Sequence, residues 1–471
     1  MRSIPATGVR CPRPIPHPVS KSVYAEIFRL GWPVFIGQVA VVSNGVIDTI
    51  MAGRYSTVDL AGVGVGAAIY FSVFIALMGV LLALTPIASQ LYGANRYSEI
   101  GEEVRQSTWL ALALGVACFA LLRYPDPVLA LTRLPADVEE RARGYLAAIS
   151  WGVPAALLFR VFYGFSTAVA RPRVVMALNL IGLAFKVPLN LVFMYGHWGA
   201  PELGGVGCAV SSSVIAWVSC VLAWSWCFLE AAYRRYHVFA RWSWPDAKRL
   251  GRIVALGLPI GLTFFIDVTG FTFMALFIAR LGAQNSAAHQ IAANFAALLF
   301  MLPLAVGNAA SVLVGHAIGA RQFQVARATG LAGLAMGFGC ALAIAALVSL
   351  SAQRIAAFYT SDAEVMKLAG ALLAFVSVYH LFDAIQAVAV NVLRGYKRAV
   401  IPMVIYAVAL WGVGLGGGYT LGLTAVDLSW LGIPTPWGAR GFWLAAIASL
   451  ALAGSLVTLY FLRVSRHPDS I

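Results

Sequence analysis

Apolar stretches of about twenty residues, the length needed to cross a bilayer as a helix, recur along nearly the whole chain. Of its 471 residues, 61% are hydrophobic and only 11% are charged, which is too few charges to cover a soluble fold of this size. Hydropathy and helix breaks predict about twelve membrane helices, roughly at residues 26–52, 60–92, 104–123, 142–169, 174–196, 204–232, 252–281, 286–317, 323–350, 366–393, 399–424 and 438–463. The sequence therefore predicts an all-α integral membrane protein in a lipid bilayer.

The basic residues indicate the topology of this membrane protein. A formal charge of +14 would suit nucleic-acid binding in a soluble protein, but in a membrane protein the placement of Lys and Arg matters more than their sum. If both termini are cytoplasmic, most of the 33 Lys and Arg residues lie on the cytoplasmic side. We therefore expect a multi-pass protein with both termini in the cytoplasm and no nucleic-acid partner.

An internal repeat divides the chain into two halves. Gly31–Pro33 opens the first predicted helix and recurs as Gly257–Pro259 at the seventh, while Leu91–Asn95 at the end of the second matches Ala317–Arg321 at the end of the eighth. The offset along the sequence is the same for both pairs, so the two landmarks agree independently. Because each half holds about six helices, an even number, the copies run in the same direction, related by a pseudo-two-fold axis along the membrane normal.

The repeat predicts two six-helix bundles around a central cavity, the layout of an alternating-access transporter. The predicted segments are a cytosolic tail at 1–22, an N-terminal bundle at 23–233, a basic cytoplasmic linker at 234–251, a C-terminal bundle at 252–463 and a cytosolic tail at 464–471. The chain holds no P-loop sequence and no legible Ser/His/Asp or HExxH arrangement, so neither ATP hydrolysis nor another enzymatic activity is predicted.

Three carboxylates, Asp48, Asp267 and Asp383, each lie inside a long apolar run of a chain with only 19 Asp and Glu residues. An isolated carboxylate in hydrocarbon costs roughly several kcal/mol. A membrane protein that keeps three of them is expected to use them, which indicates ions crossing the bilayer.

Polar side chains flank one of these carboxylates. Tyr379, Asp383 and Gln386 are spaced i, i+4 and i+7 and therefore share one helical face. A carboxylate between a phenol and an amide could hold a partly dehydrated cation or exchange a proton. The alternative is a structural hydrogen bond between helices, and the spacing alone leaves both interpretations open.

Several longer motifs, in a fixed order, resemble one known family. They are Gly45–Gly53 (GVIDTIMAG), Gly199–Cys208 (GAPELGGVGC), Ala287–Asn294 (AAHQIAAN), Asp383–Gln386 (DAIQ) and Leu393–Lys397 (LRGYK). Together they closely resemble the NorM-like branch of the multidrug and toxic compound extrusion (MATE) family, over nearly the whole chain. The resemblance implies antiport, in which Na⁺ or H⁺ enters while a bulky, often cationic, amphipathic drug or toxic compound leaves. It also implies a monomer in the bacterial inner membrane, with no cofactor besides the coupling ion.

For the C-terminal half, the resemblance makes Asp267 the second carboxylate of the cation site that contains Asp383 and Tyr379. Where the NorM-like pattern has Glu, this chain has Asp at position 267. Because Asp is one methylene shorter, a water molecule could bridge the gap between this carboxylate and a Na⁺ ion.

Three polar residues open the eighth predicted helix. Gln290 and Asn294, spaced i, i+4, are expected to line the cavity of the C-terminal half. His289 is either a hydrogen-bonded structural residue or a proton relay.

For the N-terminal half, the family uses the acid at Asp48 for coupling, and Asn44 precedes it by four residues, about one helical turn. Lys186 and Asn190 share a face of the fifth helix, and Lys186 stands where the NorM-like branch usually carries Asn. The resemblance implies packing that brings this helix near Asp48, so we predict that Lys186 pairs with Asp48 and takes the place of a bound Na⁺. Ion coupling is then left to Asp383 and Asp267, or to proton exchange at Asp48 itself. The alternatives are a helix cap at Asp48, and a Lys186 that faces a wet cavity without a partner.

Two rival functions share the membrane location. A flippase of lipid-linked oligosaccharides would have the same two-bundle layout, but it would need a strongly cationic cavity for pyrophosphate, whereas acids outnumber bases among the deep residues here. A membrane-embedded enzyme acting on lipid would need a catalytic constellation at the interface, and none is legible. Reduced retention of a dye such as ethidium by expressing cells, abolished by a protonophore or by Na⁺ removal, would indicate drug efflux.

Overall fold

The computed structural model describes residues 21–132, 134–240, 242–425 and 436–466. The first half contains α1 (Lys21–Tyr55), α2 (Thr57–Leu81), α3 (Leu84–Gly93), α4 (Tyr97–Arg123), α5 (Asp126–Thr132), α6 (Ala136–Ser150), α7 (Val153–Ala168), α8 (Pro172–Tyr195), the short turn η1 (His197–Gly199), α9 (Val206–Leu229) and α10 (Ala231–Arg234). The second contains α11 (Ala247–Ala279), α12 (Ala283–Gly319), α13 (Phe323–Tyr359), α14 (Ala363–Gly395), α15 (Val400–Ala407), the π-helical segment η2 (Val408–Gly416), α16 (Gly417–Leu423) and α17 (Ala439–Arg466).

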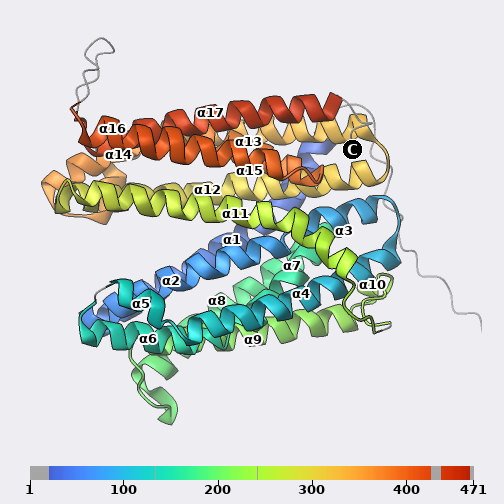
Figure 1. The fold of residues 1–471 in the computed structure, drawn as a ribbon, viewed down its shortest axis with the longest axis horizontal. Coiled ribbons are helices and arrows are strands. Elements are labelled where there is room, and N and C mark those ends of the chain that lie inside the picture. The colour runs from blue at the N-terminus through green and yellow to red at the C-terminus, as the bar shows by residue number, and fades with distance from the viewer. Residues whose placement is uncertain (1–20, 133, 241, 426–435, 467–471) are drawn as a thin grey trace, which may run out of the picture.

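The predicted fold class is confirmed. Within the described ranges, 11 helices are long and apolar enough to cross a membrane, or up to 12 if the bent pair α6 and α7 forms one span. These helices form two lobes (Figure 1), one built from the first half of the chain and one from the second. The domain bounds read from the sequence stay a prediction.

Two predicted spans are broken by proline. α2 ends at Leu81 and α3 begins at Leu84, because the ring of Pro86 clashes with the carbonyl four residues earlier and supplies no N–H. α6 and α7 meet at an angle of 49°, and Pro154 lies in the first turn of α7. Hydropathy predicts both spans as continuous, and α2 and α3 do form one candidate span, Thr57–Gly93, whereas α6 and α7 are a bent pair.

Backbone geometry confirms the repeat. Asn95 and Arg321 close the two matching segments and follow α3 and α12 with φ of 57° and 59°. Ala170 and Lys397 likewise follow α7 and α14 with φ of 59° and 57°. A left-handed conformation in a residue other than glycine is uncommon. Its recurrence at equivalent positions shows that the two halves share their helix ends as well as their helices.

The two lobes meet at the end where α1 begins and α17 ends, called here the closed end (Figure 1). There α3 crosses α12 so tightly that a Cβ on Gly93 would strike the His316 carbonyl, and one on Gly319 would strike the Gln90 carbonyl. Gln90 and His316 are themselves equivalent in the repeat, because each directly precedes one of its matching segments. The crossing therefore obeys the pseudo-two-fold axis, and glycine is required at both positions because no side chain fits.

Two side chains at this crossing join the lobes, and we call them the inter-lobe clamp. Gln90 Nε2 on α3 donates to the carbonyl of Gly395 at the end of α14, at 2.8 Å. His316 Nε2 on α12 donates to the carbonyl of Ala168 at the end of α7, at 2.7 Å. Each bond ties one lobe to a helix terminus of the other, where a carbonyl lacks a partner within its own helix.

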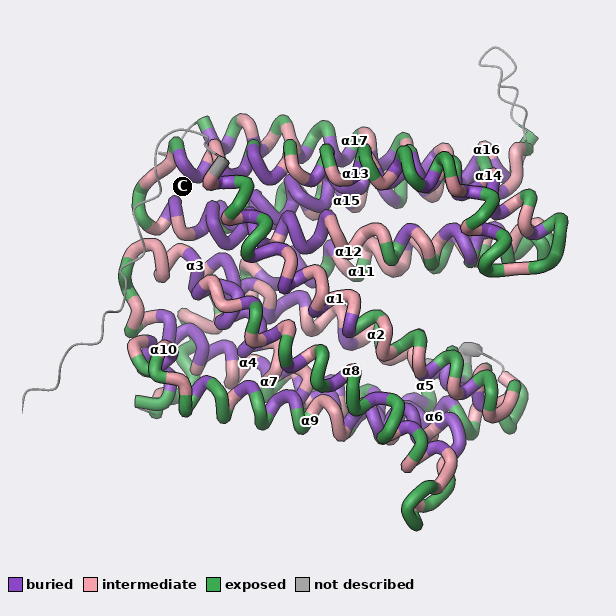
Figure 2. The backbone as a smooth tube through the Cα atoms, turned by 180° about the vertical axis from the view of Figure 1, so that it is seen from behind, coloured by how far each residue is buried: buried purple, intermediate pink, exposed green. Residues whose placement is uncertain are grey.

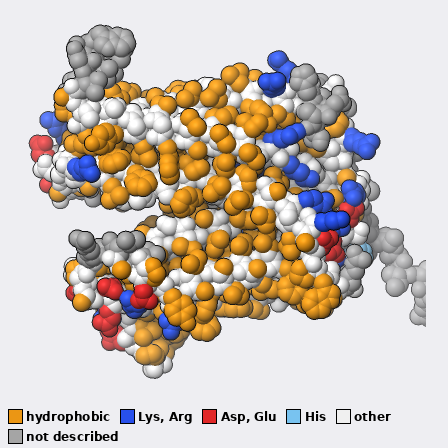
Figure 3. Space-filling view, in the orientation of Figure 1, with side chains coloured by type: hydrophobic (Ala, Val, Ile, Leu, Met, Phe, Trp, Pro, Cys, Tyr) orange, Lys and Arg blue, Asp and Glu red, His pale blue; other side chains and the backbone are white. Residues whose placement is uncertain are grey.

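At the opposite end, called the open end, the lobes separate and a cleft runs between them, as the space-filling view shows (Figure 3). Both lobes contain buried residues (Figure 2), and in the second lobe they lie along much of α12 and α14. These two helices pack extensively against each other within their lobe. They also carry Asp383 and Tyr379 in α14, and His289 in α12.

Candidate functional site

Lys186 and Asp48 form a buried ion pair inside the first lobe. Lys186 Nζ on α8 lies 2.9 Å from Asp48 Oδ2 on α1, and the two side chains are 1% and 10% exposed. The ammonium also donates to Ser212 Oγ at 2.6 Å and to the Cys208 carbonyl at 3.2 Å. Because a lysine ammonium has three donors, all of them have a partner. The pairing predicted from the sequence is present in the structure.

Asn190 completes the coordination of Asp48. Its Nδ2 donates to Asp48 Oδ1 at 2.8 Å, so each carboxylate oxygen binds a different residue of α8. Pro188 lies between Lys186 and Asn190 within the helix, where it has no N–H to donate to the backbone. Asn44, by contrast, donates to the Ala40 carbonyl of its own helix at 3.2 Å, and no bond joins it to Asp48 among the described contacts.

Both alternative interpretations of the N-terminal half, a helix cap at Asp48 and a Lys186 without a partner, are wrong. Asp48 lies well before the end of α1 at Tyr55, and its oxygens bind side chains rather than the backbone N–H groups of a helix start. Lys186 has a partner and is not exposed. The cap of the following helix is Ser56.

Two carboxylates deep in the second lobe have no cationic side chain of the described residues beside them. Asp267 on α11 and Asp383 on α14 interact electrostatically with each other and with Tyr379. Asp383 is 6% exposed and Asp267 is half-buried. No Lys, Arg or His nitrogen of the described chain lies within 4.0 Å of either carboxylate. Two acids so placed repel each other unless a proton or a cation neutralises one of them.

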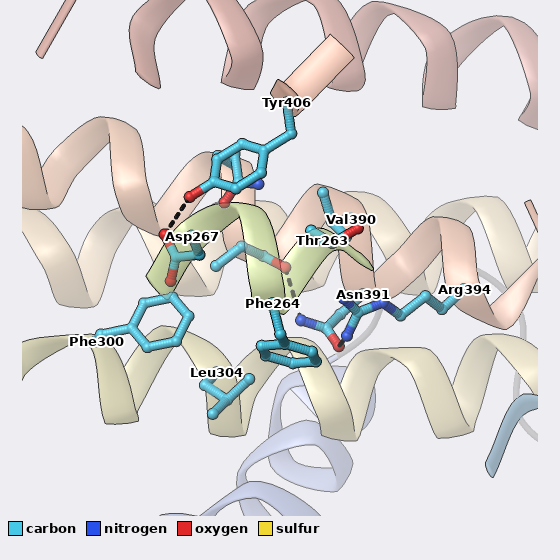
Figure 4. Close-up of a pocket in the computed structure, with 11 residues that line it drawn as sticks. Thr263, Phe264, Asp267, Phe300, Leu304, Val390, Asn391, Arg394 and Tyr406 are labelled. Atoms are coloured by element: carbon cyan, nitrogen blue, oxygen red, sulfur yellow. Dashed lines mark hydrogen bonds between the residues drawn. The ribbon is translucent and has the colours of Figure 1, made fainter. Parts of the chain in front are cut away.

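A crevice reaches one of these acids (Figure 4). It lies among α11, α12, α14 and α15, and its polar lining consists of Thr263, Asp267, Gln386, Asn391, Arg394 and Tyr406. Its volume is about 30 Å³, which suits one or two water molecules or a partly hydrated ion and excludes a drug-sized compound. The crevice is therefore an ion or water site rather than a substrate cavity.

Tyr406 is a functional candidate that the sequence did not reveal. Its hydroxyl donates a hydrogen bond to Asp267 Oδ1 (Figure 4). Tyr406 follows Lys397 by as many positions as Asn179 follows Ala170, and Asn179 Nδ2 in turn donates to the Gly37 carbonyl of α1 at 3.2 Å. Corresponding positions of the two halves thus both provide a polar link, from α8 to α1 and from α15 to α11.

The remaining predicted residues lie apart from the crevice. Tyr379 packs its ring 5.5 Å from that of Trp443 and stays buried. His289 packs against the same indole, at 5.9 Å, and its Nδ1 has no hydrogen-bond partner among the described residues. Gln290 and Asn294 are exposed and bond each other at 3.3 Å, so their expected place in the C-terminal cavity stays a prediction. The described residues contain no cluster of three or more His, Cys, Asp or Glu that could hold a metal ion.

Comparison with known proteins agrees with the repeat and with the motifs. The MatE family model matches residues 33–192 and again residues 259–420, and the two matches begin at the equivalent prolines Pro33 and Pro259. The chain is 38% identical to a probable multidrug resistance protein NorM of Aromatoleum aromaticum over 96% of both proteins. It is 36% identical to the multidrug resistance protein PmpM of Pseudomonas aeruginosa, over 94% of this chain and 92% of that protein.

Solved structures show the same fold. An outward-facing multidrug resistance MATE family transporter of the MOP superfamily superposes with a TM-score of 0.85 at 18% identity, covering 95% of this chain and 97% of that one. The Vibrio cholerae MATE transporter VcmN in its bent form gives 0.84 at 18% identity, covering 96% and 99%. The chain is a multi-pass membrane protein that belongs to the MATE family of transporters, in its NorM-like branch.

Proposed function

We propose that this protein exports amphipathic, often cationic, drugs across the bacterial inner membrane in exchange for an entering monovalent cation, Na⁺ or H⁺. The observation that carries the proposal is the contrast between the lobes. Asp48 in the first lobe is already neutralised by Lys186. Asp267 and Asp383 in the second lobe interact with each other without a cation of the protein beside them. The names of the relatives, as multidrug resistance proteins, support the drug substrate.

In the proposed orientation the closed end faces the cytoplasm. Lys and Arg side chains gather over this end of the molecule (Figure 3), as expected for the cytoplasmic side of a membrane protein. The cleft at the open end then faces outward, so the structure corresponds to the state from which a drug leaves. Alternating access would require the inter-lobe clamp to open and the lobes to meet at the other end.

Coupling follows from the charge of the second lobe. A cation or proton bound at Asp267 and Asp383 relieves the repulsion between the two carboxylates. It therefore stabilises the conformational state in which these carboxylates lie closest together. A ligand shifts a conformational equilibrium only by its difference in affinity for the two states. The acid pair provides such a difference, whereas Asp48 offers Na⁺ a site that Lys186 already occupies.

Transport in proteoliposomes tests this function. The purified protein is reconstituted, and ethidium flux is measured while a Na⁺ gradient and a pH gradient are imposed separately. We expect one gradient to drive ethidium against its concentration, and reversal of that gradient to reverse the flux. Ethidium movement that neither gradient accelerates would contradict cation-coupled antiport and favour a different driving force.

A further inference from the structure

Arg394 is a buried cation at the far end of the crevice that contains Asp267. It is 8% exposed and lies one residue before the end of α14, at the level of the inter-lobe clamp. Figure 4 shows the two side chains at opposite ends of the crevice, with Thr263 and Asn391 between them. The crevice thus runs from the acid in the middle of α11 toward the closed end.

The charge of Arg394 is not neutralised. Its Nη1 donates to Asn391 Oδ1 at 3.2 Å, and its guanidinium lies 5.1 Å from the centre of the Phe264 ring. No carboxylate of the described residues lies within 4.0 Å of it. A nearly buried charge satisfied only by an amide and a ring is costly. Part of that cost is offset because cations are favoured at the carboxyl end of a helix.

We propose that Arg394 is an electrostatic gate on the route of the coupling cation. While the closed end is shut, its positive charge prevents a cation that has reached Asp267 from continuing along the crevice to that end. The inference rests on the proposed function, because it assumes that Asp267 receives the coupling cation. A fixed cation in a narrow polar path repels passing cations, as it does in selective channels. Without this gate the cation would dissipate its gradient without moving a drug.

The repulsion between Arg394 and a passing cation is large enough to have a measurable effect. Two unit charges several Å apart in a protein of effective dielectric constant about 20 repel strongly enough to slow passage roughly tenfold or more. The crevice has a volume of only about 30 Å³ and is lined by Arg394, so a cation inside it lies close to the guanidinium. A loss of the charge should therefore appear as a leak of Na⁺ or H⁺ that needs no drug.

Two variants abolish the net positive charge of the gate, one by removing Arg394 and one by neutralising it. Arg394→Gln removes the guanidinium itself. Asn391→Asp keeps Arg394 and places a carboxylate oxygen where the amide oxygen now lies, 3.2 Å from Nη1, so it neutralises the gate with almost no change in shape. Arg394→Lys keeps the charge. Asn391→Leu is the matched control, because it loses the Nδ2 bond to the Ala387 carbonyl, as Asn391→Asp does, without adding a charge.

The test measures drug-independent cation leak in proteoliposomes, with Na⁺-sensitive and pH-sensitive dyes inside and a membrane potential imposed. We expect Asn391→Asp and Arg394→Gln to leak at least roughly tenfold faster than the wild type, in Na⁺ or in H⁺ according to the coupling ion. Arg394→Lys and Asn391→Leu should stay tight.

The gate proposal would be overturned if proteoliposomes with Asn391→Asp leaked cations no faster than the wild type. It would also be overturned if Asn391→Leu leaked as fast as Asn391→Asp. If Arg394→Gln does not fold, the near-isosteric Asn391→Asp decides alone. Failure of the proposed function is a separate result, since it would appear as wild-type ethidium flux that ignores both gradients.

Discussion

Lys186 Nζ lies 2.9 Å from Asp48 Oδ2 in the interior of the first lobe, with both side chains almost fully buried. The two lobes therefore differ, because Asp48 in the first lobe is paired with a lysine, whereas Asp267 and Asp383 in the second lobe have no cationic side chain of the described residues within 4.0 Å.

The pair predicts non-additive stability. Lys186→Met and Asp48→Asn should each lower the free energy of unfolding by roughly 3–5 kcal/mol, since each leaves a buried partner uncompensated. The double variant should recover part of that loss. Thermal unfolding in detergent measures all four proteins. A double variant whose loss equals the sum of the single losses would show that the two residues do not interact.

Asp383 should be essential for active efflux and dispensable for folding. Asp383→Asn keeps the shape of the side chain but removes its charge, so ethidium efflux should fall to near background while membrane expression stays normal. Glu364→Gln, an exposed acid in the first turn of the same helix, is the matched control and should transport normally. Efflux by Asp383→Asn at the wild-type rate would remove Asp383 from the coupling site.

A longer acid at position 267 should keep partial activity. Asp267→Glu restores the side chain that the resembling family commonly carries, and the crevice beside it has room for water that can yield to the added methylene. Ethidium efflux at matched expression compares this variant with Asp267→Ala. Equally complete loss in both would indicate that the Tyr406 hydroxyl and its surroundings accept only the shorter acid.

The inter-lobe clamp should bias the lobes toward the present arrangement. Each hydrogen bond of Gln90 and His316 contributes roughly 0.5–1.5 kcal/mol, so Gln90→Ala with His316→Ala should raise the population of the opposite arrangement about fivefold or more. Distances between spin labels across the open end measure that population. Gln290→Ala, which breaks only an exposed bond to Asn294, should leave the distances unchanged, and unaltered distances in the double variant would contradict the clamp.

The sequence predicted the elements better than their contacts. Hydropathy identified the spans, and the internal repeat anticipated that Gly93 and Gly319 would occupy equivalent positions, because both signals recur along the chain. The bend between α6 and α7 was not predicted, although Pro154 marks it. Hydropathy averages over a window and does not register a single missing N–H.

The two halves of the candidate site were not equally predictable. Lys186 and Asn190 are one turn apart on a common face, and the packing implied by the family resemblance brings that face near Asp48, which together suggested the pair. Tyr406 and Asp267 lie far apart in the sequence, and nothing local to either residue shows that α15 turns its hydroxyl toward α11. The charge of Arg394 was visible in its motif, but its lack of a carboxylate depends on three-dimensional packing.

The central claim is that the coupling cation binds in the second lobe and that the first lobe needs none. Cation movement per drug molecule, measured as Na⁺ or H⁺ uptake during ethidium export from proteoliposomes, tests it most directly. The double variant Asp48→Asn with Lys186→Met should keep the wild-type ratio of cation to drug, whereas Asp383→Asn should show no coupled cation uptake. Coupled uptake that survives in Asp383→Asn and disappears in the double variant would contradict the claim.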